Sequence, residues 1–132
     1  MQNRKNAFAV IYTLELQDLK DHLCERIAVY QKQFEEGNIS SYVFRENRAL
    51  LENEICGLDV FLEKFRKLDL NTFSTIEELR DVLKIQNEKL CGEEGIAYPI
   101  ADMANKKAEK ITAYLKESQK VDEGFISYIQ FR

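Results

Sequence analysis

A single apolar stripe dominates the first quarter of the chain. Its side chains recur every three or four residues, with a mean step of about 3.7: Phe8, Tyr12, Leu16, Leu19, Leu23, Ile27, Tyr30 and Phe34. This step is close to the 3.6 residues of a helical turn, so the pattern predicts one continuous helix over residues 7–36. A helix of this length with one apolar side needs a partner of similar length, which directs the fold toward packed helices.

The next segment predicts such a partner. Residues 35–38 form a polar break whose glycine and asparagine can adopt the left-handed conformation, and Ser40 or Ser41 then offers a hydroxyl to cap a second helix over 41–68. Because the link is short, the two helices should run antiparallel. The second apolar stripe contains Phe44, Leu51, Ile55, Leu58, Leu62 and Phe65.

Two residues interrupt the second stripe, and each has two interpretations. Asn47 lies on the stripe, so it is either a buried residue that fixes the register of packing or a half-exposed residue. Gly57 either allows close approach of another backbone or is half-exposed.

Overlapping capping boxes, Ser74 with Glu77 and Thr75 with Glu78, predict the start of a third helix over 75–91. Gly92 and Gly95 should end it. Pro99 suits a first helical turn and predicts a fourth helix over 98–119. The inward positions of the third helix are Ile76, Leu79, Val82, Leu83 and Leu90, with polar Gln86 on the same stripe. The fourth has an unusually small face, formed by Ala97, Ala101, Ala104 and Ala108.

The chain of 132 residues, with one proline and five glycines, therefore predicts a single all-α domain over 1–132. We expect an antiparallel, up-down-up-down four-helix bundle with two long helices, two shorter helices and an apolar C-terminal tail over 121–132. The two long helices should extend beyond the shorter pair. The tail is too apolar for a solvated segment, so we expect it to dock on its own bundle or on another chain, including a second copy.

The charge balance disfavours duplex nucleic acid as a partner. Nineteen basic and 23 acidic residues give a formal net charge of −4, which repels phosphate backbones. The weaker alternative is nucleic-acid contact through a basic stripe on the fourth helix, which consists of Lys106, Lys107, Lys110, Lys116 and Lys120. Its excess of charge is small because Asp102, Glu109 and Glu117 lie among these lysines.

The sequence also suggests a compartment. The apolar run after Arg4 and Lys5 continues into an acidic helical pattern and not into a cleavage site, and there is no apolar stretch of about 20 residues that would span a membrane. Three widely spaced cysteines without a CxxC motif are typical of a reducing environment, so we expect a cytoplasmic protein.

The residues for common catalytic and metal sites are scarce. His22 is the single histidine and no Glu-x-x-His motif occurs, which excludes the usual di-iron site of helical bundles. His22 and Cys24 lie on different sides of a helix, which disfavours zinc. We expect Cys24 and Cys56 to pack as small hydrophobic residues and Cys91 to be the most exposed and reactive thiol. The prediction is a non-enzymatic protein without a metal or other cofactor.

The leading functional hypothesis is a protein–protein interaction module of the adaptor, chaperone or inhibitor type, which presents a helical hairpin or groove to a protein partner or to a second copy. The alternative is a small-ligand or enzymatic bundle with a pocket between helices. The predicted partner-binding residues lie near helix ends or in the tail: Tyr42, Tyr98, Phe125, Ile126, Tyr128, Ile129 and Phe131.

The two long helices joined at Glu35-Glu36-Gly37-Asn38 loosely resemble the flagellar-export chaperones, over Leu14 to Leu68. That resemblance implies a client helix bound at the tail and the exposed end of the hairpin.

Overall fold

The computed structural model describes residues 2–117, and all of its regular elements are helices that pack antiparallel, which confirms the predicted all-α bundle. In chain order they are α1 (Gln2–Glu35), α2 (Ser41–Arg66), the short 3-10 helix η1 (Leu70–Thr72), α3 (Ile76–Glu94) and α4 (Tyr98–Glu117). The predicted tail over 121–132 lies outside the described residues.

Capping residues explain the helix boundaries. Ser40 accepts a hydrogen bond from the Val43 amide at 3.1 Å and so begins α2, while Gly37 turns the preceding link with a φ of 78°. Of the two overlapping capping boxes, the structure uses Thr75, whose hydroxyl accepts from the Glu78 amide at 3.1 Å. The carboxylate of Glu78 accepts from the Ser74 amide, one residue earlier than in the standard box.

The predicted end of α3 at residue 91 is wrong by three residues. The helix continues to Glu94 and ends where Gly95 adopts the left-handed conformation, with a φ of 67°. Gly92 remains helical because a single glycine weakens a helix by only about 1 kcal/mol relative to alanine, and Gly95 supplies the stronger stop signal.

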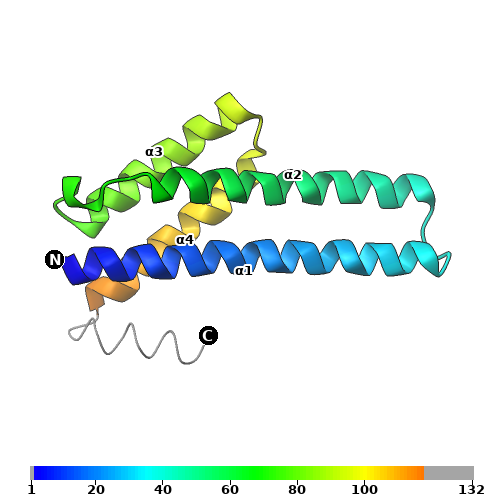
Figure 1. Ribbon diagram of the computed structural model, residues 1–132, viewed down its shortest axis with the longest axis horizontal. Helices are drawn as coiled ribbons and strands as arrows, with labels where there is room; N and C mark the ends of the chain where they lie inside the picture. Colours follow the sequence, from blue (N-terminus) through cyan, green and yellow to red (C-terminus); the bar gives the residue numbers. More distant parts are fainter. Residues whose placement is uncertain (1, 118–132) are drawn as a thin grey trace.

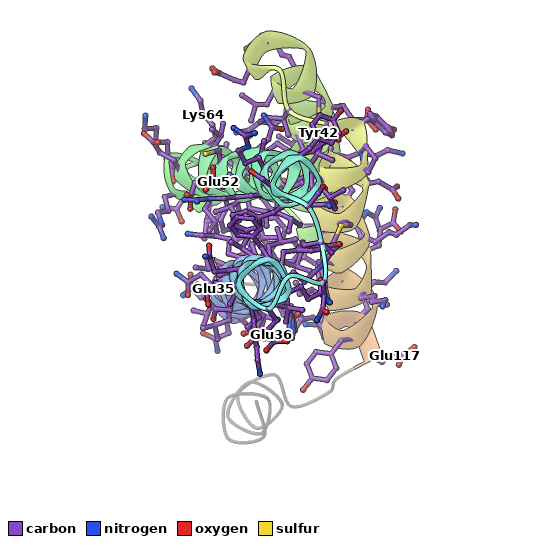
Figure 2. The ribbon with its side chains drawn as sticks, turned by 90° about the vertical axis from the view of Figure 1, so that its right-hand side faces the viewer. Glu35, Glu36, Tyr42, Glu52, Lys64 and Glu117 are labelled. Carbon is purple, nitrogen blue, oxygen red and sulfur yellow. The ribbon has the colours of Figure 1, made fainter. Side chains whose placement is uncertain are left out.

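The hairpin of α1 and α2 extends well beyond α3 and α4, as expected from the lengths of the helices (Figure 1). Helix α4 crosses the half of the hairpin that contains both the start of α1 and the end of α2, and α3 packs mainly on α4. The end-on view places α4 along one side of the hairpin (Figure 2). The other half of the hairpin, which includes the α1–α2 link, therefore has only two layers.

The main core lies where α4 covers the hairpin. Tyr12 is at its centre, with ring centroids 5.8 Å from Phe8 and 4.8 Å from Phe65. Ala101, Ala104 and Ala108 face this core from α4 and are almost completely buried, as predicted from the small apolar face. Ala97 is the exception, because it precedes the helix and is exposed.

Gly57 is buried and allows the start of α4 to approach α2. A methyl group placed on Gly57 would lie 2.7 Å from Cγ2 of Ile96 and 3.6 Å from Cγ2 of Ile100. The close-approach interpretation is therefore correct, although a side chain and not a backbone makes the approach.

The polar residues on the apolar stripes are half-buried, and a different polar residue lies in the core. Asn47 is half-buried, which agrees with the second of its two interpretations, and donates to the Val43 carbonyl of its own helix at 2.9 Å. Gln86 is also half-buried. The adjacent Asn87 is buried and donates through Nδ2 to the Tyr12 hydroxyl at 3.2 Å and to Oδ1 of Asn105 at 3.1 Å. This network joins α1, α3 and α4 in one register, because a shift of any helix would leave a buried polar group without its partner.

Candidate interaction surface on the hairpin

One side of the hairpin is divided into a covered and an uncovered half. In the covered half, α2 contributes Gly57, which lies against Ile96 and Ile100, and α1 contributes Ile11 and Glu15, which face α4. The Glu15 carboxylate pairs with Lys107 of α4 at 3.2 Å. These contacts define which side of each hairpin helix faces α4.

The same side continues beyond α4 with apolar residues. Seven residues are nearly two helical turns, so positions seven apart share a side of a helix. On α2, the positions seven and fourteen residues before Gly57 are Leu50 and Val43, both exposed. On α1, the position fourteen residues after Glu15 is Val29, which is also exposed. Two helices thus present apolar side chains on the side that α4 covers elsewhere.

Alongside Val29, the surface of α1 is hollowed. Arg26, Val29, Tyr30 and Gln33 line a depression of about 200 Å³. We call the set formed by these four residues together with Val43 and Leu50 the uncovered face. Its borders carry both signs of charge, because Arg26 lies on α1 and Glu46 and Glu54 lie on the neighbouring turns of α2.

The seam beneath the uncovered face is complete and holds the two helices together. Phe34 and Phe44 stack with ring centroids 5.1 Å apart, and Leu23 of α1 and Leu51 of α2 are buried. Within residues 2–117, every buried side-chain nitrogen or oxygen has a hydrogen-bond partner. The uncovered face is therefore the surface of a formed hairpin, and not a gap in its packing.

The two predicted tyrosines of the described chain lie in the first turns of different helices, Tyr42 in α2 and Tyr98 in α4. Tyr42 lies in the first turn of α2, on the opposite side of that helix from buried Phe44, and is 69% exposed (Figure 2). Tyr98 begins α4, is exposed, and donates a hydrogen bond to the Glu88 carboxylate at 3.3 Å. The negative charge of Glu88 raises the pKa of the Tyr98 phenol above its ordinary value. The structure does not bring these two residues into one site.

The other predicted partner-binding residues lie outside the described residues. These are Phe125, Ile126, Tyr128, Ile129 and Phe131. Sequence reasoning also missed Val29, Val43 and Leu50. Two signals in combination would have found them. The helix lengths show that the hairpin extends beyond α4, and the seven-residue spacing from Gly57 shows which apolar positions continue the side of α2 that α4 covers.

The prediction for the cysteines is wrong. Cys24 and Cys56 are exposed, since each lies on the outer side of its helix and not in the seam, whereas Cys91 is half-buried beside the core. Burial, followed by the nearby Glu88 charge, raises the pKa of the Cys91 thiol, which lowers its reactivity at neutral pH.

Over residues 2–117, histidine, cysteine and acidic side chains form no group of three that would hold a metal ion. No helix among α1 to α4 has an apolar stretch long enough to cross a bilayer.

The basic stripe on α4 is partly neutralised by neighbouring acidic residues. Lys106 pairs with Asp102 at 2.9 Å, and Lys107 pairs with Glu15 at 3.2 Å. The hydrogen bond that Lys106 donates to the Asp102 carboxylate raises the pKa of Lys106. Lys120 lies outside the described residues. These pairs leave less positive charge for a phosphate backbone than the lysine spacing suggested.

No protein-family model matches the chain, no curated protein is significantly similar to it, and no solved structure matches it.

Proposed function

We propose that this protein is a non-enzymatic interaction module whose uncovered face binds an amphipathic helix of a protein partner. The observation that carries this proposal is that α4 covers only half of one side of the hairpin, while the same side continues with exposed Val29, Val43 and Leu50. Two helices that pack side by side form an apolar groove between them. A third helix can bind there by packing its own side chains into that groove.

The bundle itself supplies the model for such a contact. Ile100 of α4 and Ile96, just before that helix, lie over Gly57 in the covered half, and a charged pair, Lys107 and Glu15, lies at the border. A partner helix on the uncovered face would meet the same kind of surface: apolar residues in the middle and Arg26 or Glu46 at the edges. Such a helix would present apolar residues every three or four positions and charges of both signs on its flanks.

The proposed surface can be tested by introducing charge on it. We expect the double variant Val29→Glu, Leu50→Glu to lose the partner that the wild-type protein captures from its source cell. The matched control is Ile85→Glu on α3, because Ile85 is 68% exposed and Leu50 is 60% exposed. The control should retain the partner.

Capture alone does not test the mode of binding. The interacting segment of the captured protein should therefore be prepared as a peptide and its dissociation constant measured. We expect the double variant to weaken binding at least about tenfold, with the control unchanged, and circular dichroism to show that the peptide gains helix on binding. If every captured protein binds the double variant as well as the wild type, the uncovered face is not the binding surface. A concentration-dependent dimer that the same substitutions abolish would instead assign the face to a second copy.

A further inference from the structure

A second apolar groove lies between α1 and α4, away from the uncovered face. Its volume is about 200 Å³, and it is lined by Ile11 and Glu15 of α1 and by Lys107, Lys110, Ile111 and Tyr114 of α4. The two isoleucines form a buried floor. The Glu15–Lys107 pair lies at one end, and Tyr114, three residues before the end of α4, lies at the other.

We propose that residues 125–132 of the same chain occupy this α1–α4 groove. This proposal does not depend on the proposed function, because the groove shares no residue with the uncovered face. The occupant is the segment that follows α4 and contains five apolar residues within seven positions, namely Phe125, Ile126, Tyr128, Ile129 and Phe131.

The length of the connecting segment favours this groove over the uncovered face. Residues 118–124 separate the end of α4 from Phe125, and seven residues span at most about 25 Å when fully extended. Tyr114 is already at the groove, so a reversal of the chain within 118–124 brings Phe125 back to it, and Gly124 suits such a turn. Val29 of the uncovered face is 18 residues along α1 from Ile11, which is about 27 Å and beyond this reach.

The length and charge of the groove also match the segment. The wall of the groove on α4 runs from Lys107 to Tyr114, about 10 Å, and eight residues in a helix extend about 12 Å. Lys110 borders the groove and forms no ion pair with another residue of the described chain. The acidic pair Asp122-Glu123 precedes Phe125 and can reach Lys110 as the chain turns.

The test is lysine footprinting of the full-length chain by brief acetylation and mass spectrometry. We expect Lys110 to be protected in the wild type and to react about fivefold faster in the variant Phe125→Ser, Ile129→Ser, which corresponds to a segment that is docked in most molecules. Lys84 of α3, which is exposed and lies outside the groove, is the internal control and should react equally in both proteins.

A second variant, Ser127→Ala with Gln130→Ala, changes the same segment without removing its apolar residues and should keep Lys110 protected. If the first variant fails to fold, as judged by circular dichroism, Phe125→Ser alone should give an intermediate loss of protection. Equal reactivity of Lys110 in the wild type and the folded serine variants would overturn the proposal. So would protection that disappears on dilution together with a dimer mass, because the occupant would then come from a second copy.

Discussion

At the end of the hairpin near η1, Phe8 and Tyr12 lie beneath α4 and are completely buried, whereas at the opposite end Phe34 is 36% exposed although it stacks on Phe44. The same helix and the same apolar stripe supply Phe8 and Phe34. The first end is also contacted by α3, α4 and η1, whereas α1 and α2 alone form the second end within residues 2–117. The comparison teaches that a two-helix seam can bury side chains such as Phe44 and still leave Phe34 partly exposed, and that the uncovered half keeps an apolar surface.

Substitution of matched leucines in the two halves tests this comparison with the largest expected effect. Leu58 lies on α2 under the covered half, and Leu51 lies seven residues earlier on the same stripe, toward the uncovered half. We expect Leu58→Ala to lower the free energy of unfolding by about 2–5 kcal/mol, and Leu51→Ala to cost less, because the two-layer half can relax around the lost side chain. Urea denaturation measures both. Equal costs would show that the two halves are packed equally well.

The covered half should also be the part that is sensitive to alkaline pH. Burial raises the pKa of the Tyr12 phenol to about 12, and the hydrogen bond from Asn87 acts in the opposite direction. Because this value lies above the ordinary value of 10.0, the neutral phenol contributes its full stability below pH 10, and that contribution is lost as the pH rises from 10 to 12. The stability difference between wild type and Tyr12→Phe should therefore shrink by about 2–3 kcal/mol over this range.

The control for this pH profile is Tyr42→Phe, because Tyr42 is exposed on the hairpin outside the core. This variant measures the effect of removing an exposed tyrosine hydroxyl, and its free energy of unfolding at neutral pH should differ from that of the wild type by no more than about 0.5 kcal/mol. A Tyr12→Phe difference that is independent of pH would show that burial does not raise the pKa of the Tyr12 phenol.

The sequence predicted the elements of the fold because the determining interactions are local. The stripe from Phe8 to Phe34, the Ser40 cap and the capping residue Thr75 each depend on neighbours within four residues or on one helical repeat. The network around Asn87 could not be predicted in this way, because its partners Tyr12 and Asn105 lie 75 and 18 residues away. Neighbouring polar residues such as Gln86 and Asn87 cannot be distinguished from the sequence alone, because the packing of the helices determines which of them is buried.

The candidate surface illustrates the same limit. Helix lengths alone predicted that the hairpin would extend beyond the shorter helices, but the side on which this leaves apolar residues exposed depends on where α4 crosses. Gly57 sets the position of this crossing because it leaves room for the side chain of Ile96. Once the crossing is known, Leu50 and Val43 are identified as exposed apolar residues on the side of α2 that α4 covers elsewhere. Tyr42, which the sequence favoured because tyrosine is common at interfaces, lies on a different side of α2.

The close approach at Gly57 can be tested by substitution, with a smaller expected effect on the free energy of unfolding. We expect Gly57→Ala to lower the free energy of unfolding by about 1 kcal/mol, because the clash with Ile96 outweighs the gain in helix propensity. Gly92→Ala in α3 is the matched control, since a methyl group there meets no atom within 4 Å. The control should be stabilised by up to about 1 kcal/mol. A stabilised Gly57→Ala would mean that α4 does not approach α2 this closely.

The smallest expected effect concerns the stability of the uncovered face itself. Leu50→Glu should change the free energy of unfolding by no more than about 0.5 kcal/mol, because the side chain is 60% exposed and glutamate is a good helix former. The same is expected for Ile85→Glu, so thermal denaturation should give nearly equal midpoints for both variants and the wild type. A surface that serves binding and not folding must behave in this way, since its apolar contacts are made only in the complex. A loss of several kilocalories per mole in Leu50→Glu alone would place Leu50 in the folded core and remove the reason for assigning a partner to this side of the hairpin.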